Sequence, residues 1–173
     1  MPHVMNTTSS VAPLDVEVLR QFRQIFQSVR KHFQSVEAAC GISGSQLWAL
    51  ARITETPGLR VTELAAAMAI HQSTASNLIE HLVRAGYVQR VRSATDQRAV
   101  LLHPTESGQQ VFAKAPQPLR GVLPEALSRL SPEELRALNG QLARLITLLG
   151  SAVDQTAADM PLAEMTQLND RVL

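Results

Sequence analysis

Apolar residues recur every three or four positions along much of the chain, which is the period of an amphipathic helix. The first such stripe predicts a helix from Leu14 to about Ala39, and Gly41 ends it. A second helix is predicted from Ser43, because its hydroxyl and the amide of Gln46 can form a capping box. These patterns predict that the chain outside its middle part is almost wholly helical.

The segment from Val61 to Pro104 has a different organisation. It begins with a short, alanine-rich helix, for which Thr62 is the predicted cap, and a tight turn follows. The next helix has a buried apolar stripe and ends at Gly86, which suits a left-handed cap. Small polar side chains occupy its first turn, largely off that stripe: Gln72, Ser73, Thr74, Ser76 and Asn77. This order of elements is that of a helix–turn–helix motif.

A β-hairpin is predicted directly after this motif. Two strand-like runs, Val88–Arg92 and Ala99–His103, flank a loop at residues 93–98. A helix that meets base edges must be slim and polar at its leading end, and a hairpin beside it needs cations that reach phosphates or a minor groove. The segment therefore favours DNA binding over the alternative of a small helical core with a solvated hairpin.

The same segment resembles the winged-helix region of the MarR family, the multiple-antibiotic-resistance regulators. The matching features are a Leu-x-x-x-Gly-x-Val helix end at residues 82–88, an Asp-x-Arg wing tip at residues 96–98, and a Leu-Thr-x-x-Gly-type helix start. At that start a His-Pro pair precedes Thr105, which we expect to alter only the helix entry. The resemblance is specific over Leu47–Phe112, and over the flanking helices it depends on their order and length.

The C-terminal part of the chain is again predicted to be helical. A helix from Thr105 should be kinked or interrupted by the prolines at positions 116, 118 and 124. The next helix has a strong start signal in Ser131-Pro132-Glu133-Glu134, which supplies a cap, a first-turn proline and a capping-box acid. Leucines then recur at steps of 3, 4, 3 and 4 residues: Leu135, Leu138, Leu142, Leu145 and Leu149.

That leucine stripe and the N-terminal stripe lie at opposite ends of the chain, where one compact wing domain cannot cover both. Ordinary core packing is the alternative explanation of such a stripe. We expect the two terminal regions to pack together and against a second copy, and the resemblance implies an intertwined dimerisation lobe. A two-fold dimer also suits DNA, because two equivalent helices recognise a pseudo-palindrome with half-sites about one helical turn apart.

The predicted fold class is mainly α with a small β-hairpin wing, arranged as a winged helix–turn–helix domain plus a helical dimerisation lobe. The DNA-binding winged region spans residues 43–104, and the lobe combines residues 14–42 with residues 105–156. Residues 1–13 are expected to form a flexible N-terminal arm, and residues 157–173 a C-terminal tail.

Base readout is predicted for the first turn of the second motif helix. The amides of Gln72 and Asn77 can read adenine, and serine or threonine hydroxyls can bond several base edges. The candidate hydroxyls are those of Ser73, Thr74 and Ser76. Because this turn holds no Arg or Lys, we expect guanine readout to be weak and DNA shape to contribute more of the specificity.

The wing supplies the other predicted DNA contacts. Arg98 matches the family's wing arginine, and we expect it at the minor groove or the DNA backbone. Asp96 is expected to hold the wing, by capping the loop or pairing with a neighbouring arginine, because an acid facing phosphate would repel it. Arg90 and Arg92 can either contact phosphates or form strand salt bridges.

The resemblance also implies a small, frequently aromatic, anionic ligand in the cleft between the lobe and the wing domain. Trp48 and Arg52 lie one turn apart on the second predicted helix, where an indole and a guanidinium could hold an aromatic carboxylate. His71 and Arg23 are further candidates for this site. The alternative is that Trp48 is a core residue and Arg52 a surface cation.

Composition and charge change this picture little. The chain has 173 residues, is 45% hydrophobic and has a net charge of +1, which suits one domain with appendages. Four arginines and one aspartate give the segment from Arg84 to His103 a local charge of +3, a localised electrostatic footprint. The sequence has no apolar run long enough for a bilayer and no signal-peptide pattern, so no membrane partner is expected.

Other chemistry is poorly represented in the sequence. The single cysteine, Cys40, excludes an internal disulfide and fits a cytoplasmic protein. Its place at a helix C-terminus should raise the thiol pKa, so an inert thiol is expected and a thiol-oxidation sensor is the alternative. No two histidines lie three or four residues apart, so no metal site is predicted. The sequence has no phosphate-binding loop and no nucleophile–base motif, so neither an enzyme nor a cofactor is predicted. A small-molecule effector is the only ligand expected besides DNA.

Together these patterns predict a cytoplasmic, homodimeric transcriptional repressor that a small aromatic or anionic molecule releases from double-stranded DNA. The competing class is a winged-helix module whose polar face binds another protein. The wing separates the two, since a protein adaptor need not keep arginines beside a slim polar helix.

Overall fold

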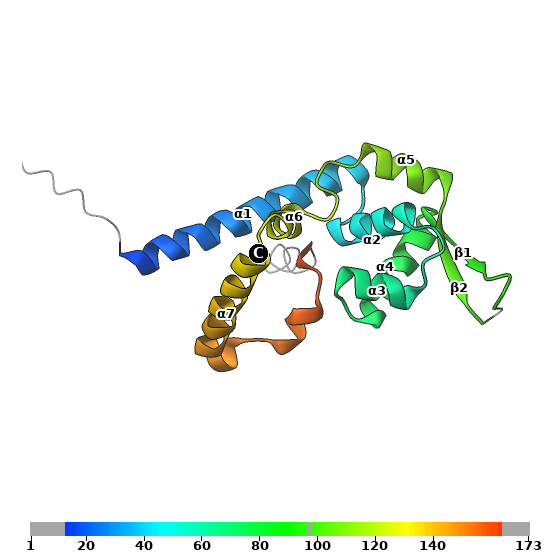
Figure 1. The fold of residues 1–173 in the computed structure, drawn as a ribbon. Helices are drawn as coiled ribbons and strands as arrows, with labels where there is room; N and C mark the ends of the chain where they lie inside the picture. Colours follow the sequence, from blue (N-terminus) through cyan, green and yellow to red (C-terminus); the bar gives the residue numbers. More distant parts are fainter. Residues whose placement is uncertain (1–12, 97, 164–173) are drawn as a thin grey trace, which may run out of the picture.

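The computed structural model describes residues 13–96 and 98–163, and it is mainly helical with one two-stranded antiparallel hairpin, as predicted (Figure 1). The predicted arm up to residue 12, Gln97 of the wing loop and residues 164–173 of the tail lie outside the described residues. The long elements are α1 (Leu14–Cys40), α2 (Gly44–Glu55), α3 (Val61–Met68), α4 (Gln72–Arg84), β1 (Val88–Arg92), β2 (Val100–Pro104), α5 (Glu106–Lys114), α6 (Val122–Ser128) and α7 (Pro132–Leu149). Two short 3₁₀ turns follow, Gly150–Ala152 and Gln155–Asp159.

Most helix boundaries lie where the capping residues predict them. Gly41 ends α1 in the left-handed region, with φ of 68°, and its N–H donates to the carbonyl of Glu37 at 2.9 Å. The Ser43 hydroxyl accepts from the Gln46 N–H at 3.2 Å, and the Gln46 side chain accepts from the Ser43 N–H at 3.0 Å. This capping box satisfies N–H groups that have no partner inside the helix, which fixes the start of α2.

The core lies where α2, α3 and α4 meet β2. Its largest side chains have 0% exposure: Leu47, Leu50, Ile53, Leu64, Ile79, Leu82 and Leu102. Burying a leucine or isoleucine of this kind contributes about 1.5–3 kcal/mol. The helix–turn–helix formed by α3 and α4 is therefore held on a rigid base, and the hairpin projects from one end of it (Figure 1).

Two predicted boundaries are wrong. Thr62 is not the cap of α3, because the helix begins at Val61 and its N-cap residue is Arg60, whose N–H donates to the carboxylate of Glu63 at 2.7 Å. With that N–H satisfied by Glu63, the helix starts without a serine or threonine cap. The second strand begins at Val100 and not at Ala99, whose N–H donates to the Asp96 carbonyl at 2.9 Å and so belongs to the loop.

Ala69 ends α3 with φ of 53° and ψ of 46°, a left-handed conformation that disfavours a residue with a Cβ atom. Ala69→Gly is expected to raise the free energy of unfolding by about 0.5–1 kcal/mol, because glycine adopts this region without steric cost. Urea unfolding measures the change. The matched control is Ala66→Gly in the helical part of α3, which should lower stability by a similar amount. If Ala69→Gly and Ala66→Gly change the free energy of unfolding by the same amount in the same direction, the conformational explanation is wrong.

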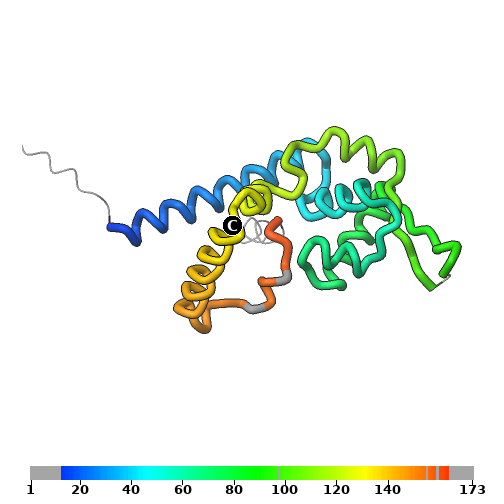
Figure 2. Tube along the Cα trace, viewed as in Figure 1, coloured from blue at the N-terminus to red at the C-terminus, as the bar shows by residue number. Residues whose placement is uncertain are grey.

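The terminal helices extend beyond this core. α1 contacts α6, and α7 begins at the predicted Ser131 cap, where the hydroxyl accepts from the Glu134 N–H at 3.3 Å. The leucines at positions 135, 138, 142 and 145 are 36–39% exposed in the single chain. After α7 the chain turns back, and Pro161–Ala163 return to the side of α1 and α2 (Figure 2).

Candidate nucleic-acid interface

The first turn of α4 presents polar side chains on a firmly anchored helix. Gln72, Ser73 and Asn77 are exposed, and Thr74 and Ser76 are half-buried. The opposite side of the helix is held in the core by buried residues: Ala75, Leu78, Ile79 and Leu82. The structure thus brings all five predicted reading residues together on one short stretch of surface.

Ser76 is more restricted than the sequence suggests. Its hydroxyl donates to the carbonyl of Gln72, one turn back, at 2.9 Å. A hydroxyl has one proton and two acceptor lone pairs. In this arrangement Ser76 therefore offers only an acceptor to a ligand, while Ser73 keeps an exposed hydroxyl in this turn.

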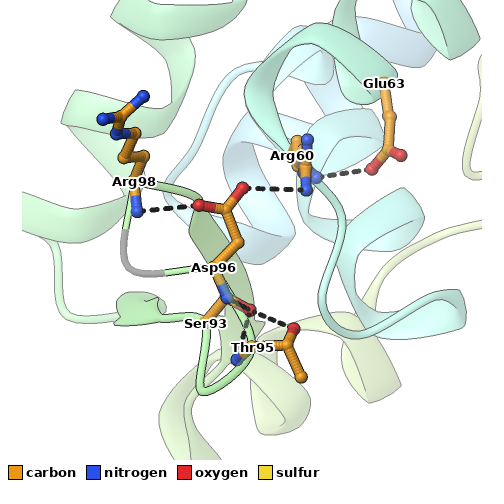
Figure 3. Close-up of polar contacts among 6 residues, drawn as sticks. All are labelled: Arg60, Glu63, Ser93, Thr95, Asp96 and Arg98. Atoms are coloured by element: carbon orange, nitrogen blue, oxygen red, sulfur yellow. Dashed lines mark hydrogen bonds and ion pairs between the residues drawn. The ribbon is translucent and has the colours of Figure 1, made fainter.

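The wing is a two-stranded antiparallel ladder, in which Val88 pairs with Pro104 and Arg92 with Val100. In the loop, one carboxylate oxygen of Asp96 accepts from the Arg98 N–H at 3.1 Å (Figure 3). Its other oxygen lies 3.8 Å from a guanidinium nitrogen of Arg60. Asp96 therefore has both of the predicted contacts, a loop cap and an arginine partner.

The contact of Arg60 with the wing was not predicted from the sequence. Arg60 precedes α3, far from the wing in the chain, and no local spacing indicates that it meets Asp96. Its backbone N–H is also bonded to Glu63, which fixes the segment that carries the guanidinium (Figure 3). The pair connects the wing loop to the start of the helix–turn–helix, although an exposed ion pair of this kind contributes at most about 1 kcal/mol.

The wing arginines differ in their partners. Arg90 lies 3.1 Å from one oxygen of Glu80 on α4, so it takes the predicted salt-bridge role, and Arg84 lies 3.7 Å from the other oxygen. Arg92 and Arg98 are exposed, and no ion pair joins either guanidinium to a residue within 13–96 or 98–163. The Arg98 guanidinium points away from Asp96 (Figure 3). The uncompensated positive charge of the wing therefore lies at Arg92 and Arg98.

The four predicted ligand residues are not brought together. Trp48 lines a small cavity whose cation is Arg120, whereas Arg52 does not line it and pairs with Glu55 at 2.9 Å. His71 lines a separate shallow hollow at the turn between α3 and α4. Arg23 is exposed on α1. The predicted cradle of Trp48 and Arg52 is therefore not the arrangement around the indole.

Cys40 is half-buried, and burial raises the pKa of its thiol. The direction agrees with the prediction, and a raised pKa disfavours the reactive thiolate. Within the described ranges, no three His, Cys, Asp or Glu side chains lie close enough together to hold a metal ion. Among the same residues, no helix has the length and apolar character needed to cross a membrane.

Comparison with known proteins gives one consistent result. The MarR family profile (MarR_2) matches residues 41–99. A candidate transcriptional regulatory protein for the hcr operon of Thauera aromatica is 30% identical over 116 residues, which cover 67% of this chain and 70% of that protein. The transcriptional regulator BilQ of Clostridium symbiosum is 32% identical over 105 residues, 61% of this chain and 73% of BilQ.

The fold is also that of a solved winged-helix regulator. The structure of the S. aureus MepR–DNA complex matches with a TM-score of 0.53 and 24% identity, over 76% of this chain and 97% of MepR. The matched proteins are regulators of transcription and not enzymes. The polar first turn of α4, the arginine-bearing wing and these similarities lead to one conclusion: the chain belongs to the MarR family of transcriptional regulators.

Proposed function

We propose that this protein is a homodimeric repressor that binds double-stranded DNA at a specific sequence and leaves it when a small molecule binds. The observation that carries the proposal is the combination of the first turn of α4 with the wing. The turn has exposed hydrogen-bonding side chains and no carboxylate, and the wing, which is joined to α4 by the Arg90–Glu80 ion pair, adds two uncompensated arginines, Arg92 and Arg98. The similarity to a regulator solved as a DNA complex supports the same assignment.

The reading helix is α4, with its first turn in the major groove. The exposed amides of Gln72 and Asn77 suit adenine, and the exposed hydroxyl of Ser73 suits several base edges. Ser76 contributes an acceptor, because its proton is already bonded to the Gln72 carbonyl. The absence of Arg and Lys from this turn leaves part of the specificity to the shape and deformability of the site.

The wing extends the contact along the DNA backbone or into the minor groove. Arg98 is the principal cation, and Arg92 adds a phosphate contact from the strand. Arg90 has a smaller part, since its guanidinium is already paired with Glu80. Asp96 and Arg60 hold the loop that presents Arg98.

Dimerisation uses the apolar faces of the terminal helices. Six leucines of α7 and several apolar side chains of α1 are exposed in a single chain, among them Leu14, Leu19 and Phe26. Monomeric proteins rarely expose apolar patches this extended. A second copy that covers them places two α4 helices on the same face of a duplex, related by a two-fold axis.

Selection of bound duplexes from a random pool tests the proposal. The expected result is one enriched pseudo-palindrome whose affinity falls steeply as salt is added, because bound arginines release counterions. A protein-interaction module would enrich no sequence and would bind duplex weakly at any salt concentration. That outcome would replace the proposal with the alternative of a winged helix that binds protein.

Two substitutions of Asp96 separate the effect of its hydrogen bond to the Arg98 N–H from the effect of its ion pair with Arg60. Asp96→Asn keeps an acceptor for the Arg98 N–H and loses the charge pair with Arg60, so duplex affinity should fall by no more than about fivefold. Asp96→Ala loses both contacts and should weaken binding by roughly tenfold, because a hydrogen bond contributes about 1 kcal/mol. Fluorescence anisotropy with a labelled duplex measures both values. Equal affinity for the wild type and Asp96→Ala would remove Asp96 from wing positioning.

A further inference from the structure

Glu80 is the only acidic residue between Gln72 and Arg92, the stretch that contains the reading helix and the first strand of the wing. It follows Ser76 by four residues and Asn77 by three, so its side chain lies on the same side of α4 as theirs. In the proposed complex this side of α4 faces the duplex, where an unpaired carboxylate would repel the phosphates. The contacts of Glu80 explain why an acid is placed there.

The carboxylate of Glu80 holds two arginines, one with each oxygen. One oxygen accepts from a guanidinium nitrogen of Arg90 on β1 at 3.1 Å. The other oxygen lies 3.7 Å from a guanidinium nitrogen of Arg84, one turn further along α4. Glu80, Arg90 and Arg84 keep 50%, 41% and 71% of their side-chain surface exposed. Ion pairs this exposed add little to the stability of a fold, so their effect lies in the charge that they leave at the surface.

The wing carries its cations on the side that meets the reading helix. β1 packs beside α4 (Figure 1), and Arg90 and Arg92 are two residues apart on β1, so they project from the same face of the hairpin. That face begins at Val88, which is 2% exposed, and the contact of Arg90 with Glu80 joins it to α4. The face therefore presents two arginines towards the reading helix, and Glu80 neutralises one of them.

Positive charge at this junction acts on every DNA sequence. An arginine that contacts a phosphate releases counterions whatever the neighbouring bases are, so a free cation strengthens binding to unrelated duplexes. Specificity is the ratio of the affinity for the selected site to the affinity for unrelated DNA, and this ratio falls when the sequence-independent part of binding rises. A carboxylate that holds two guanidinium groups keeps that part small.

We propose that Glu80 is a specificity-determining residue, which withholds Arg84 and Arg90 from the phosphates of unrelated sequences. The same carboxylate joins the wing strand to the reading helix, so the wing reaches DNA together with the base contacts of α4. Without this link, the long arginine side chains would be free to reach phosphates in any register of the helix. The inference rests on the proposed binding of DNA and adds to it a source of discrimination.

A direct base contact is the other role open to an acid on this helix, because glutamate accepts from the amino group of cytosine. The structure disfavours that role, since both oxygens of Glu80 already have guanidinium partners. The two roles differ when the charge is removed. Loss of a cytosine contact weakens binding to the selected site alone, whereas loss of the neutralising charge strengthens binding to unrelated DNA.

Glu80→Gln separates these roles, because it keeps an oxygen that accepts from Arg90 and removes the charge. Fluorescence anisotropy with the full-length protein compares the duplex selected from a random pool with an unrelated duplex of equal length, over a range of salt concentrations. Affinity for the unrelated duplex should rise at least about threefold, and its slope of log affinity against log salt should steepen by about one. Affinity for the selected duplex should stay the same or fall, because the wing is held less firmly on α4.

Glu55→Gln is the matched control. Glu55 is 47% exposed and pairs with Arg52 at 2.9 Å on α2, which carries none of the predicted DNA contacts. This variant changes the net charge equally and frees one arginine, yet it should leave both affinities and both salt slopes unchanged. A second comparison makes Glu80→Gln in a protein that already carries Arg84→Gln and Arg90→Gln. There it should no longer strengthen binding to the unrelated duplex, since it releases no cation.

The inference is overturned if Glu80→Gln leaves the affinity and the salt slope for the unrelated duplex unchanged, or if Glu55→Gln raises them equally. An increase that persists without Arg84 and Arg90 also overturns it. So does a fall in affinity for both duplexes, the result of a merely structural role, or a loss confined to one cytosine of the selected site. The proposed function fails by a different result, in which the wild type prefers no duplex in the selection.

Discussion

Leu142→Glu is expected to convert the proposed dimer into monomers at micromolar concentration and to abolish specific DNA binding. Leu142 lies at the centre of the α7 stripe and is 38% exposed in the single chain. In the dimer, glutamate would enter a leucine seam with no cation to pair it, and a buried unpaired charge costs about 3–5 kcal/mol. The dissociation constant of the dimer should therefore rise by roughly three orders of magnitude. Sedimentation velocity measures the assembly, and duplex binding should fall with it, because one half-site supplies too few contacts.

Gly140→Glu is the matched control for this variant. It adds the same charge to α7 but lies about 200° round the helix from Leu142, and a Cβ atom at position 140 projects into open space. It should leave both the dimer and DNA binding intact. Loss of the dimer in both variants would indicate a general effect of charge on α7, and a monomeric wild type would contradict the architecture itself.

Arg98→Ala is expected to weaken specific binding by roughly tenfold and to lower the slope of log affinity against log salt by about one, with the dimer unchanged. The physical reason is the position of this arginine. Its backbone is fixed by Asp96, while its guanidinium is exposed and points away from that carboxylate (Figure 3). The cation is thus presented to a phosphate or a minor groove without an internal partner to compete for it.

Arg136→Ala provides the comparison for the wing variant. Arg136 is an exposed arginine on α7, so its removal changes the net charge equally without touching the wing. Its salt slope should equal that of the wild type. If Arg98→Ala and Arg136→Ala have the same slope and affinity, Arg98 does not contact DNA.

Features encoded by neighbouring residues were predictable from the sequence. The start of α2 needs only Ser43 and Gln46, and the start of α7 needs only Ser131 and Glu134, so both partners of each capping box are visible within four residues. The same locality explains the error at Thr62. The acceptor at the start of α3 is a glutamate that reaches back to Arg60, a contact that the propensity of threonine for caps does not reveal.

Features that depend on distant residues were not predictable. Periodicity shows which side of a helix is buried, but it does not show which residues from other segments meet there. Arg60 reaches Asp96, and Arg120 lines the cavity beside Trp48, through the tertiary arrangement alone. By contrast, the partner of Arg52 is Glu55, three residues further on the same helix, and this spacing was a local sign that Arg52 was already paired.

In the proposed complex, two α4 helices of a dimer read two half-sites on one face of the duplex. The most direct test takes the duplex selected from a random pool and inserts five base pairs between its half-sites, which rotates one half-site by about half a helical turn. We expect the affinity to fall by roughly a hundredfold or more, to the level of duplex of unrelated sequence. Unchanged affinity for the lengthened site would contradict it, because a rigid two-fold dimer cannot reach both half-sites from opposite faces.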